Sequence, residues 1–165
     1  MTLGTNAFGC DAVLPDRVRI SDCGLATAVA DAAARRSAVL KDLLARVEHS
    51  DGRVVVTMHP PTGPDTPLLG GLSHAVSVEG RLRVLSIVVF GNVDDVMIAI
   101  VGHELRHALE VLELSTATTK AEVNALFDRI GWRTPKGAVE TQAALDAGDA
   151  IARELRASKP NPSVR

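Results

Sequence analysis

The run Ile100-Val101-Gly102-His103-Glu104-Leu105-Arg106-His107-Ala108-Leu109 combines a metal-binding pattern and an acid in one largely apolar stretch. Residues four apart on an α-helix lie one turn apart on the same face, so His103 and His107 can present two imidazole nitrogens to one metal ion. Glu104 lies about 100° further round the helix, where it can reach a water on the metal without being a ligand. This HExxH spacing is typical of zinc hydrolases, in which the metal acidifies the water and the carboxylate accepts its proton.

The residues around the motif predict a largely buried helix over Val93–Leu114. They are mostly apolar and include Val96, Met97, Ile98, Val111 and Leu112. Polar side chains on a buried helix face need partners, so two histidines there favour a metal site. The alternative is a pair of core histidines with hydrogen-bond partners of their own, accompanied by an exposed Glu104.

A catalytic zinc usually has three protein ligands and one open position, so a third ligand is needed. The longer pattern HExxHxxGxxH would place it nearby, but Glu110 and Glu113 occupy its glycine and final histidine positions. Without the glycine the helix continues, which turns Glu113 about 120° away from His107. Glu122 comes next, but Thr119 and Glu122 form the capping-box pattern of a short helix, which explains this acid without a metal.

Glu140 is the better candidate for the third ligand. It begins the last predicted helix, over about residues 138–157. The same face of that helix is apolar and rich in small residues, namely Ala143, Ala144, Ala147, Ile151 and Leu155. A carboxylate on such a stripe needs a partner, which a metal ion supplies, and the small residues allow a close approach to the HExxH helix. The alternative is an acid that favours the positive end of the helix dipole.

At these residues the chain resembles the gluzincins, thermolysin-like zinc peptidases with HExxH on one helix and a glutamate ligand on a downstream helix. It is more narrowly similar to small bacterial proteins assigned as zinc peptidases, in the segments His103-Glu104-Leu105-Arg106-His107-Ala108-Leu109-Glu110-Val111 and Val139-Glu140-Thr141. The resemblance implies that His103, His107 and Glu140 bind one zinc ion (Zn2+) and that Glu104 is the general base.

The chain departs from the gluzincin pattern at two points. Ala144 stands where these enzymes usually carry an aspartate, and the sequence contains no tyrosine to stabilise the oxyanion. His59, His74 and Arg133 are candidates for the oxyanion role, the two histidines because they end predicted strands near a sheet edge. For each the alternative is an ordinary surface or structural role.

Glu110 lies on the same helix face as both motif histidines. It can orient a ligand histidine by hydrogen bonding to its second ring nitrogen. Alternatively, it accepts a bond from Arg106 or Arg133 in a salt bridge at the edge of the core.

Composition indicates one domain with a core of its own. The chain has 165 residues, 46% of them hydrophobic, and a formal net charge of −2 without a basic block, which argues against nucleic acid as a partner. Val84–Val101 approaches the length of a membrane span, but Asp94 and Asp95 interrupt it, so no span is expected.

The compartment stays open at this point. The first residues show no signal-peptide pattern, which fits a cytoplasmic protein or a secreted or periplasmic one whose signal has been removed. Cys10 and Cys23 can pair in an oxidising compartment or remain two free thiols.

Periodicity and turn residues predict an α+β domain in which a small antiparallel sheet packs on a helical layer. We expect residues 1–22 to be irregular and residues 23–165 to form one minimal zincin-like catalytic domain. Strands are expected at residues 53–58, 72–78 and 81–90, with helices at 24–48, 93–114, 119–130 and 138–157. Pro60–Pro67 contains four prolines and predicts an irregular loop.

These patterns favour a zinc metallopeptidase acting on a peptide or protein substrate. Two other functions are compatible with the motif: a deformylase-like amide hydrolase with Cys10 or Cys23 as a ligand, and a non-catalytic, zinc-stabilised domain that binds another protein. The sequence does not indicate an oligomeric state.

A domain of this size has no second lobe to close over a substrate. We therefore expect an open groove rimmed by the Pro60–Pro67 and Trp132–Pro135 loops. The substrate would lie extended on a sheet edge near His74 or along Leu82–Phe90. Weak selectivity for substrate side chains is expected to follow.

Overall fold

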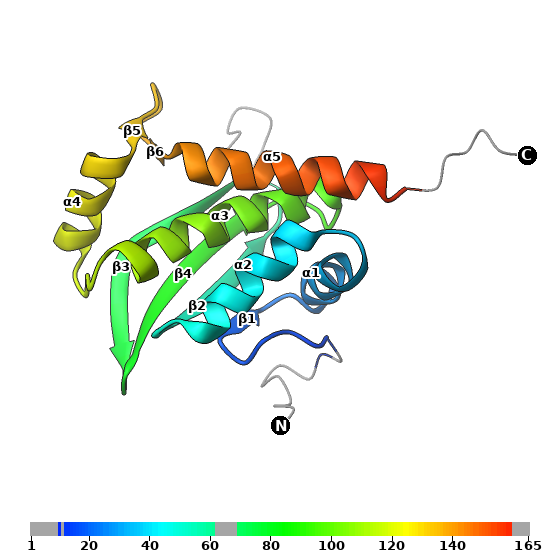
Figure 1. Ribbon diagram of the computed structural model, residues 1–165, viewed down its shortest axis with the longest axis horizontal. Coiled ribbons are helices and arrows are strands. Elements are labelled where there is room, and N and C mark those ends of the chain that lie inside the picture. The colour runs from blue at the N-terminus through cyan, green and yellow to red at the C-terminus, as the bar shows by residue number, and fades with distance from the viewer. Residues whose placement is uncertain (1–9, 11, 62–68, 160–165) are drawn as a thin grey trace, which may run out of the picture.

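The computed structural model describes residues 10, 12–61 and 69–159, and its centre is a four-stranded sheet. The strands of this sheet are β1 (Val18–Ile20), β2 (Gly52–His59), β3 (Gly70–Glu79) and β4 (Leu82–Phe90). They lie side by side in the order β1-β2-β4-β3 (Figure 1). β1, β2 and β4 are parallel, whereas β3 runs antiparallel to β4 at one edge.

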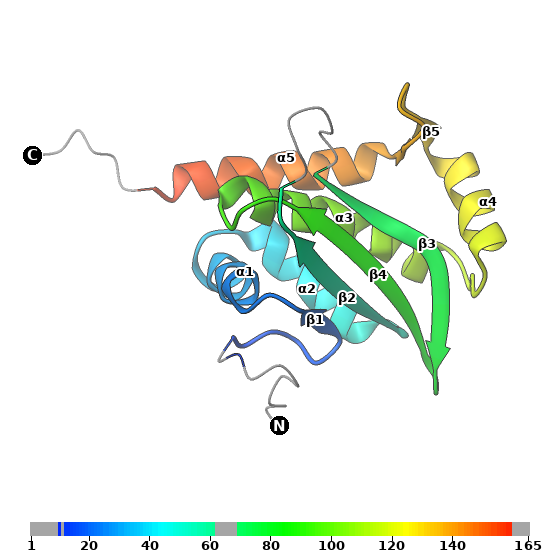
Figure 2. The same cartoon turned by 180° about the vertical axis from the view of Figure 1, so that it is seen from behind.

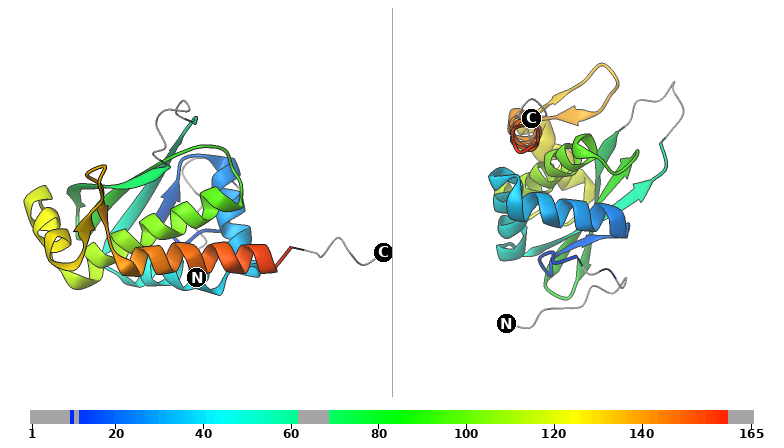
Figure 3. Two further views of the ribbon diagram at one scale, coloured as in Figure 1. Left: turned by 90° about the horizontal axis from the view of Figure 1, so that it is seen from above. Right: turned by 90° about the vertical axis from the view of Figure 1, so that its right-hand side faces the viewer.

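Helices cover one face of the sheet. They are α1 (Cys23–Arg35), α2 (Ala38–His49) and α3 (Asp95–Leu114), and Figure 2, seen from behind, shows the opposite sheet face in front of them. Helix α5 (Gln142–Ala157) runs along α3 (Figure 3), and α4 (Lys120–Ile130) lies beside β3. A small antiparallel ribbon of β5 (Trp132–Arg133) and β6 (Val139–Glu140) connects α4 to α5.

The α+β class is confirmed, but the expected antiparallel direction holds only for the β3–β4 hairpin. That hairpin turns at Gly80, whose φ of 63° lies in the left-handed region that glycine adopts without strain. β1 and β2 are parallel because α1 and α2 carry the chain back between them, and β2 and β4 are parallel because β3, between them in sequence, runs the opposite way on the far side of β4. The strand β1 also shows that the expected irregular segment, residues 1–22, contributes to the sheet.

The helix expected over residues 24–48 is two helices. Ser37 interrupts it by adopting an extended conformation and accepting a hydrogen bond from the backbone N–H of Leu40, which makes it the N-cap of α2. The apolar residues that recur at helical spacing along both helices are buried, namely Leu25, Val29, Ala32, Leu40, Leu43, Leu44 and Val47. The helical conformation of this segment was therefore predicted, and the break at Ser37 was missed.

Glycines allow α3 and α5 to pack closely. A Cβ on Gly102 would clash with Ile151 of α5, and a Cβ on Gly148 would lie 3.2 Å from the Cβ of His103. The close approach expected from the alanines of the last helix thus depends on glycine from both helices. It brings α5 against the face of α3 that carries the motif.

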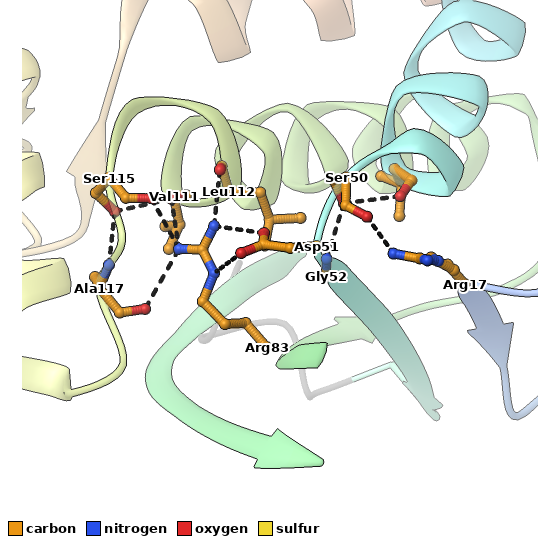
Figure 4. A network of polar contacts seen from close by, with 10 residues as sticks. Arg17, Ser50, Asp51, Gly52, Arg83, Val111, Leu112, Ser115 and Ala117 are labelled. Carbon is orange, nitrogen blue, oxygen red and sulfur yellow. Dashed lines mark hydrogen bonds and ion pairs between the residues drawn. The ribbon is translucent and has the colours of Figure 1, made fainter. Parts of the chain in front are cut away.

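A buried arginine of β4 caps the C-terminal end of α3 (Figure 4). The guanidinium of Arg83 makes two bonds to the carboxylate of Asp51, at 2.6 Å and 3.1 Å. It also donates to four backbone carbonyls at the end of the helix, those of Val111, Leu112, Ser115 and Ala117. These carbonyls have no partner within the helix, so Arg83 satisfies them and balances the helix dipole.

Cys10 and Cys23 form a disulfide that ties the segment before β1 to the start of α1. Among the described residues, no helix is long and apolar enough to cross a membrane. Most of the expected Pro60–Pro67 loop, residues 62–68, lies outside the described part of the chain.

Candidate metal centre

Three side chains that can bind a metal ion lie close together. His103, His107 and Glu140 each offer one ligand atom, and these atoms lie within 4.8 Å of one another. The Nε2 atoms of His103 and His107 lie 3.4 Å and 3.3 Å from the same oxygen, Oε1 of Glu140. The set therefore could hold a metal ion, as the helical spacing of the two histidines and the choice of Glu140 predict.

Glu140 reaches this position from a strand, which corrects the expected helix start. The residue lies in β6 opposite Trp132, and α5 begins only at Gln142. The cause is the β5–β6 turn, in which Gly137 has a φ of 81° and donates to the carbonyl of Thr134. Trp132 and Arg133 accordingly belong to a strand and not to the loop expected over Trp132–Pro135.

Thr141 joins the third ligand to the helix that follows. It is the N-cap of α5, because its hydroxyl accepts from the backbone N–H of Ala144. Its own N–H donates to Oε1 of Glu140 over 3.0 Å, and its hydroxyl donates to Oε1 of Glu110 over 2.8 Å. The signal that sequence reasoning missed is a threonine three residues before Ala144, which marks a helix start at this point.

Glu110 orients a ligand histidine, one of the two roles left open by the sequence. Its Oε2 accepts from Nδ1 of His107 over 3.0 Å, which leaves Nε2 of that ring directed at Glu140. The alternative salt bridge is absent from the described contacts: Arg106 pairs with Glu113 at 3.5 Å, and Arg133 pairs with Asp128 at 2.9 Å.

Glu104 is buried beside the ligands, which contradicts the alternative of an exposed acid. Only 6% of the residue is exposed, and its carboxylate accepts from the backbone N–H of Leu72 on β3. The pKa of Glu104 is raised to about 7, mainly by burial and also by the nearby charge of Glu140, against the opposing effects of His107 and the Leu72 N–H. A carboxylate buried this deeply destabilises the fold unless a cation lies nearby or the group is protonated.

The two histidines differ in their electrostatic surroundings. Burial lowers the pKa of His103, although the charge of Glu140 opposes the change. Burial also lowers the pKa of His107, but the hydrogen bond to Glu110 and the surrounding carboxylates outweigh it, so the net pKa is raised. The ring of His103 also bonds to the backbone of Ala144, so each ligand histidine has a second partner.

Of the three oxyanion candidates, His74 is the best placed. It lines the same cavity as both motif histidines, its Nδ1 lies 2.6 Å from Oδ1 of Asn124, and its ring stacks on Phe127 at 5.0 Å. Arg133 lines this cavity too, but it is largely exposed and paired with an acid. His59 stacks on Phe90 at the end of β2 and is not among the residues that line the cavities at the metal centre.

The candidate metal centre opens into two adjoining cavities, which share Gly70, His103, Glu104 and Ala138. One has a volume of about 490 Å³ and contains His74, His107 and Glu140. The other has a volume of about 700 Å³ and extends between α3 and α5. Residues 70–74 of β3 line the smaller cavity, so this strand forms one wall of the site.

Two further expectations are settled by these contacts. Glu122 forms the capping box with Thr119 and lies outside the ligand cluster, as expected. Within the described part of the chain, the sheet edge beside the site is β3, near His74, and the expected alternative, Leu82–Phe90, is wrong because β4 is paired on both sides. Gly70 allows the close approach of β3, since a Cβ there would lie 2.8 Å from Ile100.

Comparison with known proteins identifies no relative. No family model, no curated protein and no solved structure matches the chain. The resemblance to gluzincins therefore stays a prediction based on two short segments. The functional proposal is therefore based on the geometry of the candidate metal centre.

Proposed function

We propose that the protein is a zinc-dependent metallopeptidase of the gluzincin type. The observation that carries the proposal is the convergence of His103, His107 and Glu140 beside the buried carboxylate of Glu104, in a cavity bordered by a free strand edge. A structural site would need only the ligands. The additional acid and the adjoining space are what hydrolysis requires.

Zinc is the metal that best fits this donor set. Two imidazoles and one carboxylate match the three protein ligands of catalytic zinc sites, which leave one position open. When bound, zinc would acidify a water molecule and polarise the carbonyl of the substrate. Glu110 would keep His107 in the tautomer whose Nε2 is free to bind the metal.

Glu104 would act as the general base. Its carboxylate lines both cavities and is held by the N–H of Leu72, so it can accept a proton from the attacking water and donate it to the leaving amine. With both ring nitrogens protonated, His74 would donate from Nε2 to the developing oxyanion, while Nδ1–H donates to Oδ1 of Asn124. Its contacts with Asn124 and Phe127 fix the ring in the cavity, which positions this donor at low entropic cost.

The substrate would be a peptide in extended conformation. Among the described strands, β3 is paired only with β4, so its other edge can bind a peptide backbone by strand addition. This edge passes the metal centre at residues 70–74. Backbone bonds to groups of this edge other than the N–H of Leu72, which already donates to Glu104, would align a peptide bond with Glu104 and the metal.

The disulfide supports two further parts of the proposal. Cys10 and Cys23 are the only cysteines of the chain and are bonded to each other, so the structure offers no thiolate for a deformylase-like site. Disulfides persist mainly in oxidising compartments, which favours a secreted or periplasmic protein.

The base is tested by Glu104→Gln, with Glu113→Gln as the matched control on the same helix. Glu113 pairs with Arg46 at the surface, away from the metal centre. We expect Glu104→Gln to retain zinc after dialysis and to lose about a hundred- to ten-thousand-fold in peptide turnover. Zinc is measured by mass spectrometry of the dialysed protein and cleavage by mass spectrometry of a peptide pool. Full activity of Glu104→Gln would refute the mechanism.

The third ligand is tested by Glu140→Ala, with Glu122→Ala as the control. Loss of metal in the first variant and retention in the second are expected. The opposite result would mean that the ligand is Glu122. If the wild-type protein retains zinc but cleaves no peptide in the pool, the site is non-catalytic and serves to stabilise a binding domain.

A further inference from the structure

Thr141 is a buried residue at the junction of β6, α5 and the end of α4. It directly follows the candidate ligand Glu140 and is only 2% exposed. The junction is tightly packed, since a Cβ on Gly131 would lie 2.4 Å from the carbonyl oxygen of Glu140 and 3.1 Å from Cγ2 of Thr141. A buried hydroxyl in such a place needs hydrogen-bond partners, and the bonds of Thr141 connect it to each of the three candidate ligands.

The first connection is to Glu140. The backbone N–H of Thr141 donates to Oε1 of Glu140 over 3.0 Å. The same oxygen faces Nε2 of His103 and Nε2 of His107. The bond therefore restricts the rotation of the carboxylate and keeps its ligand oxygen directed at the two rings.

The second connection runs to His107 through Glu110. The hydroxyl of Thr141 donates to Oε1 of Glu110 over 2.8 Å, and Oε2 of the same carboxylate accepts from Nδ1 of His107 over 3.0 Å. Glu110 is 2% exposed, so solvent does not compete for these bonds. Because both of its oxygens are engaged, the carboxylate is held in one orientation and in turn holds the ring of His107.

The third connection runs to His103 through the first turn of α5. The hydroxyl oxygen of Thr141 accepts from the backbone N–H of Ala144 over 3.2 Å, which fixes the start of the helix. The ring of His103 bonds to the backbone of the same residue, Ala144. A hydroxyl can accept one hydrogen bond while it donates its proton to another group, so Thr141 serves α5 and Glu110 together.

We propose that Thr141 is a positioning residue on which the affinity of the site for its metal depends, because the bonds that orient all three ligands meet at this residue. The inference rests on the proposed function, for which zinc has to be bound. It adds a residue that touches neither the metal nor the substrate. It concerns how the ligands are held and does not depend on which bond the protein cuts.

Three variants test this role. Thr141→Val keeps the shape of the side chain and removes the hydroxyl, whereas Thr141→Ser keeps the hydroxyl. Thr119→Val is the matched control, because the Thr119 hydroxyl caps α4 by accepting from the backbone N–H of Glu122, outside the ligand cluster. Both valine variants lose a helix N-cap, but only Thr141→Val loses a bond to the metal centre. Circular dichroism checks folding, and Thr141→Ala with Thr119→Ala replaces the valine pair if Thr141→Val does not fold.

The first readout is zinc affinity, measured by competition with a chromophoric chelator. We expect about tenfold weaker binding in Thr141→Val, the lower end of the effect of residues that orient metal ligands. Thr141→Ser restores the donor and Thr119→Val leaves it in place, so both should bind zinc within about threefold of the wild type. Unchanged affinity in Thr141→Val, or an equal loss in Thr119→Val, would overturn the inference.

The second readout asks whether Thr141 acts through Glu110. In Glu110→Gln the single amide oxygen cannot accept from both Thr141 and His107, so removal of the hydroxyl has little further effect there. We expect the loss of zinc affinity in the combined variant Thr141→Val/Glu110→Gln to be at least about threefold smaller than the product of the two single losses. A combined loss equal to that product would contradict the inference, because Thr141 would then act independently of Glu110.

The third readout is the visible absorption spectrum of the Co2+-loaded proteins, which reports the geometry of the ligands. The bands should change in Thr141→Val and match the wild type in Thr141→Ser and Thr119→Val. The two proposals can fail separately. Zinc binding that depends on Thr141, without cleavage of any peptide, would refute the peptidase and support the positioning role. Peptide cleavage with an unchanged affinity and spectrum in Thr141→Val would refute the positioning role and leave the peptidase intact.

Discussion

Two groups of charged residues, built in opposite ways, lie at helix α3. At its C-terminal end, Arg83 is surrounded by acceptors, and every one of its contacts comes from Asp51 or a backbone carbonyl. The second group lies further toward the N-terminus of the helix. It consists of the histidines His103 and His107 with the buried acids Glu104 and Glu110 and the candidate ligand Glu140. The first group has its donors and acceptors matched, whereas the second has an excess of negative charge.

The difference separates a structural cluster from a candidate functional one. A buried ionic group that exists for stability satisfies its own hydrogen bonds within the protein. The metal centre instead leaves the Nε2 atoms of two histidines directed at one oxygen of Glu140, at 3.4 Å and 3.3 Å, and adjoins two cavities. A divalent cation would supply the charge that this arrangement lacks.

The largest expected effect on stability comes from the cluster of Arg83 with Asp51 and the carbonyls at the end of α3, which we call the matched cluster. Arg83→Met keeps the apolar part of the side chain but removes the donor of the Leu112, Ser115 and Ala117 carbonyls, while the Val111 carbonyl still accepts from the Ser115 hydroxyl. We expect the free energy of unfolding to fall by about 3–5 kcal/mol, as when one partner of a buried ionic group is removed. Urea denaturation monitored by circular dichroism measures the change.

Arg46→Met is the control for that experiment. Arg46 also pairs with acids, Glu113 and Asp42, but the pairs lie at the surface. The expected loss is below about 1 kcal/mol. Equal losses in the two variants would mean that burial of Arg83 has no special role at the end of α3.

The sequence was sufficient to predict the parts of the metal centre that depend on local spacing. The positions of His103 and His107 follow from one helical turn, and Glu140 is identified as an acid beside an apolar stripe. Strand β6, which contains Glu140, is not predictable in the same way, because the sequence Ala138-Val139-Glu140 also fits a helix. The strand depends on pairing with Trp132 across the turn at Gly137, and one-dimensional periodicity does not report such pairing.

Arg83 shows the limit most clearly. It lies in a strand in which neighbouring residues are apolar, and its backbone partners are between 28 and 34 residues away. The parallel pairing of β1 with β2 is missed for a related reason, since a strand of three residues is too short to show a period. Break positions such as Ser37 and Thr141 carry a usable signal, because both residues are favoured at helix N-caps.

The second prediction concerns how far the buried acid Glu104 of the metal centre lowers the free energy of unfolding of the metal-free protein. Glu104 has a pKa of about 7 in the folded state, against an ordinary value of 4.5. The folded protein therefore holds a proton that the unfolded chain releases, so stability falls as the pH rises from about 4.5 through 7. After removal of metal with a chelator, Glu104→Gln should be more stable than the wild type by about 3 kcal/mol at pH 8 and equal to it near pH 4.5.

Glu113→Gln gives the opposite sign and serves as the control. The hydrogen bond from Arg46 lowers the pKa of Glu113, so its contribution is present above the ordinary pKa and is lost as the pH falls. Denaturation curves across the pH range compare the two variants. A Glu104→Gln protein that is no more stable than the wild type at pH 8 would show that the buried carboxylate carries no such cost.

The smallest expected effect tests whether the charge of Glu110 belongs to the metal centre. Glu110→Gln keeps the size of the side chain, but it has one amide oxygen in place of two carboxylate oxygens. If this oxygen accepts from Thr141, the amide NH2 group faces His107 and the acceptor of Nδ1–H is lost. Loss of such an orienting partner typically reduces metal affinity ten- to a hundredfold, equivalent to about 1.4–2.8 kcal/mol. Zinc affinity is measured by competition with a chromophoric chelator, with Glu113→Gln again as the control. An unchanged affinity in Glu110→Gln would place Glu110 with the matched cluster of Arg83, as a residue whose bonds serve the fold alone.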